Sequence, residues 1–357
     1  MLRPLWLQYF QLRQFTRTTT VLGAFLLAAL AATLTACGGS EEAATPPNFG
    51  TTVVLGASLT DTGNTCAASP SSCPPSPPYA AGRYSNGTLW VETVAANYGG
   101  SARASLAGGT NYAYAGARTG SVRAALDAAG LTAVTLSSGA GTAPTVPGMN
   151  SALGTTPSQI DQLLTRYNFQ IPAQTLVVVD ASTFGNNISD ALTLSAQFPA
   201  SAGSIPTAIV TGAVSDMVSI INRLYAAGAR TILVVNTPNV GATPRVQALG
   251  ASAIAGATQL SATFNTVLAQ QLTGLSNVMA GAHLVLFDLF ALEAQIKGGT
   301  APGGFTLGNV TDACFVTTPT PTVCATPNTY FYWDSFHPTA TLGAYLATRA
   351  IATLPVP

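Results

Sequence analysis

The sequence predicts an α/β fold, with a parallel β-sheet and helices on both of its faces. Short apolar runs rich in valine, leucine and threonine alternate along the chain with longer stretches of helical character, an order typical of a sheet covered by helices. Most of these runs are continuously apolar, as expected of strands that are buried on both faces. Ligands of such folds bind at the carboxyl ends of the strands, so we expect the functional residues there.

Five runs qualify as strands, and four stretches between them qualify as helices. The strands are expected at 51–57, 110–115, 175–180, 231–236 and 283–287. The helices are expected at 89–98, 158–167, 206–227 and 252–272. Three segments rich in proline, glycine, serine or threonine are interpreted as loops inserted into one domain, because none of them separates two halves that each hold a core: 67–78, 130–156 and 298–327.

The composition excludes several classes of protein. Hydrophobic residues make up 48% of the chain and charged residues only 7%, so the chain has ample apolar surface to bury and is not a disordered, solvating segment. The formal net charge is zero and no basic run is present, so we expect no nucleic-acid partner. The sequence has no histidine-rich cluster, glycine-rich phosphate loop or dinucleotide fingerprint, and we expect no metal or organic cofactor.

The first residues are typical of an export signal. A basic region with three arginines precedes an uncharged apolar run at 21–34, which is shorter than the ~20 residues of a membrane-spanning helix. The run ends in Leu-Thr-Ala-Cys-Gly at 34–38, which resembles a bacterial lipobox, in which the cysteine is acylated and becomes the new N-terminus. We therefore predict a signal peptide at 1–36, lipidation of Cys37, a flexible tether at 37–48 and a single domain at 49–357.

The alternative is an ordinary signal peptide cut after Ala36, with Cys37 incidental. In the lipoprotein interpretation the chain is bound to a membrane of the cell envelope, the outer membrane being expected, through its N-terminal lipid. In the alternative it is secreted. Either way the mature chain is mildly acidic, with 10 basic and 13 acidic residues.

Four cysteines remain after export, and an even number of cysteines in an exported chain suggests disulfides. The sequence allows three pairings, of which the short local loops favour Cys66–Cys73 and Cys314–Cys324. A zinc site is the weaker alternative, since neither pair has the spacing of zinc ligands and no histidine lies beside them.

The chain has only two histidines, His283 and His337. His283 opens an expected strand and is interpreted as structural. His337 follows Asp334 by three residues, a spacing that places both side chains on one face of a turn. The carboxylate can then hold one imidazole nitrogen and leave the other free as a general base. Asp334 is also a candidate helix N-cap, and the two interpretations are compatible.

Ser58 is the best candidate nucleophile. The chain lacks the Gly-x-Ser-x-Gly elbow of the standard α/β-hydrolases, but Ser58 follows an expected strand and Gly56, which places it at the carboxyl end of the sheet. Its hydroxyl would need a neighbouring base to take its proton. The alternative is a serine that caps a helix after a buried strand.

Several segments, in order, resemble blocks of the GDSL/SGNH serine hydrolases, in particular bacterial outer-membrane esterases, haemolysin-like phospholipases and plant GDSL lipases. The resemblance rests on Gly-Ala-Ser-Leu at 56–59, Pro-Tyr-Ala-Ala-Gly-Arg-Tyr-Ser-Asn-Gly at 78–87, Gly-Thr-Asn-Tyr-Ala-Tyr-Ala-Gly-Ala at 109–117, Asn-Thr-Pro at 236–238 and Trp-Asp-Ser-Phe-His-Pro-Thr at 333–339. It implies a flavodoxin-like, three-layer α/β/α sandwich with a five-stranded parallel sheet. It also implies a monomeric enzyme that hydrolyses carboxylic esters of a lipid, a phospholipid or an acetylated sugar.

The resemblance implies a role for each matched position. Ser58 would be the nucleophile, His337 the base and Asp334 the residue that orients it. The oxyanion hole would use the backbone amides of Ser58 and Gly116 and the side chain of an asparagine, Asn187 or Asn186. Both asparagines remain candidates because the segment at 184–188 fits the family's Gly-x-Asn-Asp block in two registers. Gly116 is also interpreted as a turn glycine, which is compatible with that role.

Ala57 is a departure from the family, which has an aspartate before the serine. The missing carboxylate motivates an alternative function, a catalytically weakened binding lipoprotein on the same fold. Asp180, at the end of the third expected strand, is a candidate to take over part of the lost polar role, or else a cap on the following turn. Four tyrosines are expected either to line an acyl pocket or to pack in the core: Tyr79, Tyr84, Tyr112 and Tyr114.

Overall fold

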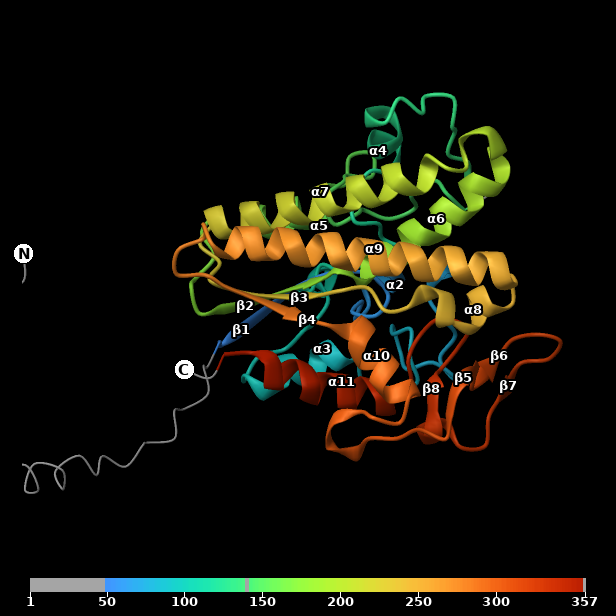
Figure 1. Cartoon of the computed structure of the whole chain (residues 1–357). Coiled ribbons are helices and arrows are strands. Elements are labelled where there is room, and N and C mark those ends of the chain that lie inside the picture. Colours follow the sequence, from blue (N-terminus) through green and yellow to red (C-terminus); the bar gives the residue numbers. More distant parts are fainter. Residues whose placement is uncertain (1–48, 139–140, 356–357) are drawn as a thin grey trace, which may run out of the picture. The chain divides into compact units, whose positions relative to one another are not determined.

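Four parallel strands form the central sheet, in the order β1–β2–β3–β4. They are β1 (Thr51–Leu55), β2 (Thr175–Asp180), β3 (Thr231–Val235) and β4 (His283–Phe287). This computed structural model describes residues 49–138 and 141–355 (Figure 1). The predicted signal peptide, Cys37 and the tether lie outside the described residues.

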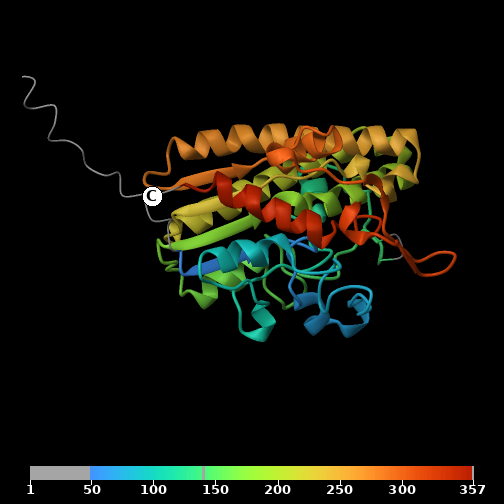
Figure 2. The ribbon, with the colours of Figure 1, turned by 90° about the horizontal axis from the view of Figure 1, so that it is seen from below.

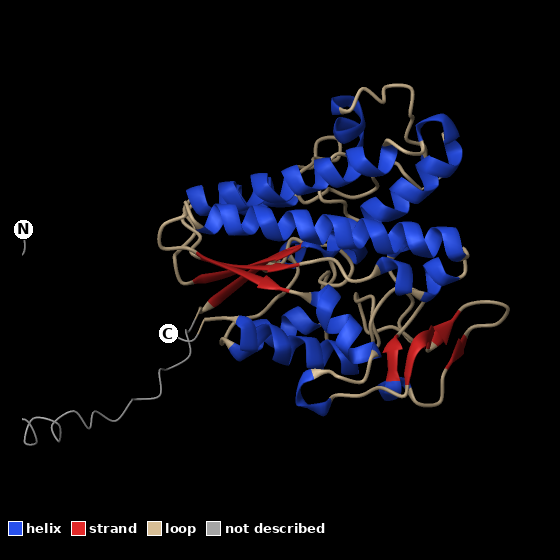
Figure 3. Ribbon diagram, viewed as in Figure 1, coloured by secondary structure: helices blue, strands red, loops and turns tan. Residues whose placement is uncertain are grey.

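Helices cover both faces of the sheet, which gives the three layers that the sequence predicts (Figures 1 and 3). One face is covered by α4 (Val122–Ala128), α5 (Gln159–Arg166), α6 (Phe184–Gln197), α7 (Ile205–Ala226) and α9 (Ala251–Ser276). The other face is covered by α3 (Trp90–Asn97), α10 (Leu289–Lys297) and α11 (Ala340–Thr353). The view from below shows α3 and α11 crossing this second face (Figure 2).

Successive residues of each strand point into different cores, which explains why the strand sequences are continuously apolar. Val53 and Leu55 pack among the helices of the first face. Val54, between them, packs among those of the second. Helix α7 is apolar and long enough to span a membrane, but half of it is buried in the first core, where it contacts α4, α6 and α9.

The four predicted helices correspond to α3, α5, α7 and α9, with ends that agree to within a few residues. For example, the helix predicted at 158–167 begins at Gln159, because the Ser158 side chain caps it by accepting a hydrogen bond from the Asp161 amide. Helices α4, α6, α10 and α11 were not predicted. A short helix, α8 (Pro244–Gln247), follows β3.

The expected strand at 110–115 is not a strand, and this prediction was wrong, so the five-stranded sheet that the family resemblance implies is not confirmed. The segment runs beside β1, where the Tyr112 amide donates to the Val54 carbonyl, but it forms only an isolated bridge. The backbone amides that would be needed for longer strand pairing form hydrogen bonds with side chains instead. The Ala113 amide donates to Asn111 Oδ1 and the Ala115 amide to Asp61 Oδ2, both at 2.9 Å. Hydrogen bonds from backbone amides to side chains, whether local as at Asn111 or distant in sequence as at Asp61, compete with strand pairing.

Both predicted disulfides are confirmed, Cys66–Cys73 and Cys314–Cys324. The first joins Cys66, inside the short helix α2 (Asn64–Ala68), to Cys73 beyond the end of that helix. Two small strand pairs form within and after the segment expected as a loop at 298–327. These pairs are β5 (Asn309–Ala313) with β8 (Tyr330–Tyr332), and β6 (Phe315–Val316) with β7 (Thr322–Val323). The second disulfide closes the antiparallel pair β6–β7, because Cys314 directly precedes β6 and Cys324 directly follows β7.

Candidate active site

Asp334 and His337 form a hydrogen-bonded pair. His337 Nδ1 lies 2.7 Å from Asp334 Oδ2 and 3.0 Å from Oδ1. The backbone amides of Phe336 and His337 each donate to Oδ1 at 2.8 Å, so the carboxylate closes the turn that carries the imidazole. The other ring nitrogen, Nε2, has no partner among the described residues and is the one free to accept a proton.

Asp334 is held in its charged form. Burial alone would raise the pKa of Asp334, but His337 beside it and the hydrogen bonds from the imidazole and two backbone amides lower that pKa to about 2. An ionised carboxylate at Nδ1 keeps the imidazole in one tautomer. It also stabilises the imidazolium that forms when Nε2 takes a proton.

The turn with Asp334 lies between β8 and α11. The Trp333 amide donates to the His337 carbonyl at 2.7 Å and closes the turn. Helix α11 begins at Ala340, and its cap is Thr339, whose side chain accepts from the Leu342 amide. The interpretation of Asp334 as the helix N-cap is therefore wrong, because Asp334 caps the preceding turn instead.

Ser58 lies in a tight turn directly after β1. The amides of Thr60 and Asp61 donate to the Ala57 carbonyl at 3.0 and 2.8 Å. The next helix begins only at Asn64, so Ser58 does not cap a helix. Ser58 is 7% exposed, and within the described part of the chain neither its hydroxyl nor its amide has a hydrogen-bond partner.

Ser58 and His337 make no direct hydrogen bond in the described residues. Catalytic hydrogen bonds are often long or poorly aligned in an enzyme without substrate and tighten in the complex. The structure thus pairs Asp334 with His337, whereas in the part of the chain that it describes it shows no hydrogen bond between His337 and Ser58.

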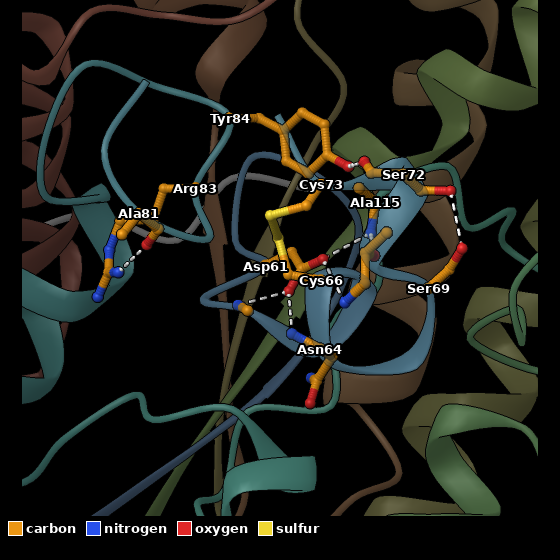
Figure 4. The surroundings of a disulfide bond; sticks show 12 residues. Asp61, Asn64, Cys66, Ser69, Ser72, Cys73, Ala81, Arg83, Tyr84 and Ala115 are labelled. Carbon is orange, nitrogen blue, oxygen red and sulfur yellow. Dashed lines mark hydrogen bonds between the residues drawn. A yellow bond between two sulfur atoms is a disulfide. The ribbon is translucent and has the colours of Figure 1, made fainter. Parts of the chain in front are cut away.

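The Asp61 carboxylate connects the segment that contains Gly116 to the turn that contains Ser58 through hydrogen bonds (Figure 4). Its carboxylate accepts the amides of residues 63–65 and also the Ala115 amide, the last at 2.9 Å. Gly116 has a φ of 83°, a left-handed conformation that favours glycine. Its amide, like that of Ser58, has no partner among the described residues.

The two candidate asparagines lie in the first turn of α6 but have different surroundings. Asn186 Nδ2 donates to the Ala117 carbonyl at 2.7 Å, beside Gly116, which leaves its second N–H. Asn187 is 3% exposed and is bound on both sides to Thr119. Its Oδ1 accepts the Thr119 amide at 3.1 Å, and its Nδ2 donates to the Thr119 hydroxyl at 3.2 Å.

A crevice at the carboxyl edge of the sheet is lined by sequence neighbours of Ser58 and His337, whereas Ser58, Asp334 and His337 themselves are not among its lining residues. Leu59, next to Ser58, lines it together with Phe336 and Pro338, which flank His337. Most of its other walls are apolar side chains from the strand ends and from α3, α10 and α11, among them Trp90, Val235, Leu289 and Leu342. This is where the fold predicts a ligand.

Asp180 ends β2 beside the Ser58 turn, as predicted. Its buried carboxylate accepts the Ser182 amide at 3.1 Å and the Thr60 hydroxyl at 3.2 Å, so it caps its own turn and also contacts that of Ser58. Burial raises the pKa of Asp180 to about 6, although these hydrogen bonds oppose the shift. Nowhere in the described ranges do three or more histidine, cysteine or carboxylate side chains gather as candidate metal ligands.

The four tyrosines divide into two pairs. Tyr112 and Tyr114 are buried in the core. Tyr79 and Tyr84 instead reach the dyad. The Tyr79 hydroxyl donates to Asp334 Oδ2 at 2.7 Å, and the ring centre of Tyr84 lies 5.3 Å from that of His337. Sequence reasoning missed both contacts, and its one signal was that these tyrosines fall in the segment at 78–87, which resembles a family block.

Known proteins share parts of this sequence. Three matching proteins of Arabidopsis thaliana, each named a GDSL esterase/lipase, are 31%, 27% and 30% identical to it over 139, 124 and 140 residues. The matches cover 35%, 34% and 36% of this chain and 37%, 35% and 37% of the relatives. The matched part of the chain thus spans little more than a third of each relative.

A family model covers much more of the chain. The model described as GDSL-like Lipase/Acylhydrolase matches residues 52–349. The match runs from β1 into α11 and includes Ser58, Gly116, both asparagines and the dyad. The chain belongs to the GDSL-like lipase/acylhydrolase family.

Proposed function

We propose that the protein hydrolyses carboxylic esters, with Ser58 as the nucleophile, His337 as the general base and Asp334 as the carboxylate that orients the base. The observation that carries this proposal is the hydrogen-bonded pair of Asp334 and His337, 2.7 Å apart, beside a crevice to which neighbours of Ser58 and of His337 both contribute. The family's description as lipases and acylhydrolases supports the same class of reaction.

The reaction would proceed in two halves. Ser58 Oγ attacks the ester carbonyl carbon while His337 Nε2 takes the hydroxyl proton. The tetrahedral intermediate then collapses, the alcohol leaves with the proton from His337, and the acyl group stays on Ser58. A water molecule, deprotonated by the same imidazole, attacks the acyl-enzyme, releases the acid and restores the Ser58 hydroxyl.

The negative charge of the intermediate would be held by three donors. The amides of Ser58 and Gly116 are supported by their lack of partners among the described residues. Asn186 is favoured as the third donor because its bond to the Ala117 carbonyl holds it beside Gly116. Asn187 is disfavoured because it is buried, whereas Asn186 is only partly buried, and because both polar atoms of Asn187 are bound to Thr119. A donor of this kind is typically worth about 3 kcal/mol in the transition state.

The proposed substrate is an ester with an apolar acyl group, such as a lipid or phospholipid, with an acetylated sugar as the smaller alternative. The apolar walls of the crevice support the first class. The two disulfides support an oxidising compartment and hence export. Attachment to a membrane through lipidated Cys37 is part of the same proposal.

The test is hydrolysis of p-nitrophenyl esters of increasing acyl length by wild type and variants. Ser58→Ala should lower kcat by at least ~10³-fold, because only the oxyanion donors and substrate binding would remain. Ser121→Ala, which removes the cap of α4 instead, is the matched control and should retain activity. Comparable rates in wild type and Ser58→Ala would refute the assignment. Binding without turnover in the wild type would favour the weakened binding protein, which the intact dyad disfavours.

A further inference from the structure

Tyr79 shares the carboxylate of Asp334 with His337. Asp334 Oδ2 lies 2.7 Å from the Tyr79 hydroxyl and 2.7 Å from His337 Nδ1. The other carboxylate oxygen is occupied by the two backbone amides of its turn. The tyrosine is therefore the one side chain besides the imidazole that bonds to Asp334 within the described residues.

The Tyr79 side chain is held rigidly in that position. Its ring packs edge-on against Phe315, at 5.5 Å between ring centres, and against Trp333, at 6.0 Å. The Phe315 amide donates to the Trp333 carbonyl, and Phe315 follows directly after a cysteine of the Cys314–Cys324 disulfide. The aromatic cluster thus links the disulfide-bonded strands to the Asp334 turn, and it aims the phenol at the carboxylate.

The phenol stays protonated and remains a donor. Burial, and then the neighbouring charge of Asp334, raises the pKa of Tyr79 well above its usual value. A hydrogen bond to a charged acceptor is stronger than one between neutral groups. It also spreads part of the carboxylate's negative charge onto the tyrosine side.

Tyr84 touches the same dyad in a different way. Its ring packs against the His337 ring, but its hydroxyl points to the Ser72 carbonyl at 2.8 Å, within the loop closed by Cys66–Cys73 (Figure 4). Its hydroxyl makes no bond to Asp334. Tyr84 is therefore a matched control, a second tyrosine in contact with the dyad whose oxygen can be removed without changing the donors to the carboxylate.

We propose that Tyr79 is a positioning residue of the dyad, which fixes the Asp334 carboxylate and limits how strongly its charge acts on His337. The proposal rests on the esterase function proposed above. It concerns the pH at which the base loses its proton, and not which residue is the base. Without the Tyr79 hydroxyl, Asp334 Oδ2 would interact with the imidazole alone. The protonated imidazole would then be better stabilised, and His337 would keep its proton to a higher pH.

The sign of the expected change follows from this. The neutral imidazole is the active base, so the acidic limb of the kcat/KM profile should move to higher pH in Tyr79→Phe. The shift expected from losing one charge-assisted hydrogen bond is about 0.5 to 1 pH unit. The ionisable groups around the dyad in the described chain are Tyr79 and Tyr84, with Asp61 acting on Tyr84 from the turn after β1. Neither substitution removes a charge at neutral pH.

Two measurements test the proposal on the full-length protein. The first is the pH profile of p-nitrophenyl acetate hydrolysis by wild type, Tyr79→Phe and Tyr84→Phe. The second is an NMR titration of the imidazole signals in a Ser58→Ala background, which needs no turnover. The chain has only two histidines, and His283, the exposed first residue of β4, serves as the internal reference.

In Tyr79→Phe, the acidic limb of the kcat/KM profile and the midpoint of the His337 titration should both move to higher pH. In Tyr84→Phe, both should stay at their wild-type pH. The His283 titration should be the same in all variants. Replacing Tyr79 with 3-fluorotyrosine, a stronger donor that keeps the ring, should move both to lower pH, and it also serves if Tyr79→Phe fails to fold. A lower kcat without any shift in the folded variants would make Tyr79 a packing residue only. Equal shifts in Tyr79→Phe and Tyr84→Phe would also overturn the proposal. Absence of ester hydrolysis in the wild type would sink the proposed function and leave the NMR test standing.

Discussion

Asp334 and Asp180 are carboxylates at the carboxyl edge of the sheet, the first partly buried in the turn that carries His337 and the second fully buried beside the turn that carries Ser58. Asp334 accepts hydrogen bonds from an imidazole, a tyrosine and two amides, and its pKa is lowered to about 2 by His337 and its donors against the opposing effect of burial. Asp180 accepts only an amide and a hydroxyl and has no basic partner among the described residues. Burial raises its pKa to about 6.

The difference shows what decides the charge of a buried carboxylate. Desolvation disfavours the anion at both positions, and it is overcome only at Asp334, where an imidazole and several other donors surround the oxygens. The Asp334 turn is therefore prepared to support a positive charge on His337. The Ser58 turn contains the Asp61 carboxylate, which is surrounded by backbone amides. Together with Gly116, Ser58 offers amides that have no partner among the described residues and can receive a negative charge.

The largest expected effect comes from removing the charge of Asp334. Asp334→Asn should lower kcat by about 10⁴-fold, as neutral replacements of the orienting carboxylate do in serine hydrolases of this type. Asp180→Asn is the matched control, and its kcat should fall by less than about 10-fold, because that carboxylate does not contact the base. The measurement is kcat for a p-nitrophenyl ester, with urea denaturation to show that both variants fold. Similar losses in the two variants would contradict the difference drawn between the two carboxylates.

Much of the fold was predictable because burial leaves a clear pattern. The strand predicted at 175–180 and the one at 283–287 match β2 and β4 to the residue. The strand expected at 110–115 failed because its amides bond to the side chains of Asn111 and Asp61. An apolar pattern does not show which side chains will compete for backbone amides, since Asp61 lies about fifty residues away.

The site was predictable where its residues are neighbours in sequence. Asp334 and His337 are three residues apart, and their pairing follows from that spacing. The hydrogen bond from Tyr79 spans 255 residues, and nothing in the local sequence indicates it. The sequence likewise did not decide which of the two asparagines is the oxyanion donor. That decision depends on their hydrogen bonds to Thr119 and Ala117, which lie on a separate loop.

The oxyanion donors give the next largest effect. Asn186→Ala should lower kcat by about 10²- to 10³-fold with little change in KM, because the lost donor acts on the transition state. Asn187→Ala should change kcat much less but lower the free energy of unfolding by about 1 to 3 kcal/mol, since it leaves the buried Thr119 amide unpaired. Kinetics and urea denaturation of both variants separate the two roles. The opposite outcome would return the oxyanion role to Asn187.

The smallest expected effect concerns Ala57, where the family has an aspartate. If Asp180 replaced that carboxylate, Ala57→Asp would rescue an Asp180→Ala enzyme. The structure gives the two side chains different neighbours. Ala57 packs with Tyr114, Ala117 and Val146, whereas Asp180 bonds to Thr60 and caps its own turn.

We therefore expect additive effects in the double-mutant cycle, with a coupling below about 0.5 kcal/mol in both kcat/KM and the free energy of unfolding. Ala57→Asp alone should be destabilising, because its carboxylate would enter an apolar cluster without a basic partner. Asp180→Ala alone should loosen the Ser58 turn through the lost bond from Thr60. Rescue of activity in the double variant would mean that a single carboxylate, supplied from either strand, is enough to support the nucleophile, and that the two sides of the site are less different than their present hydrogen bonds indicate.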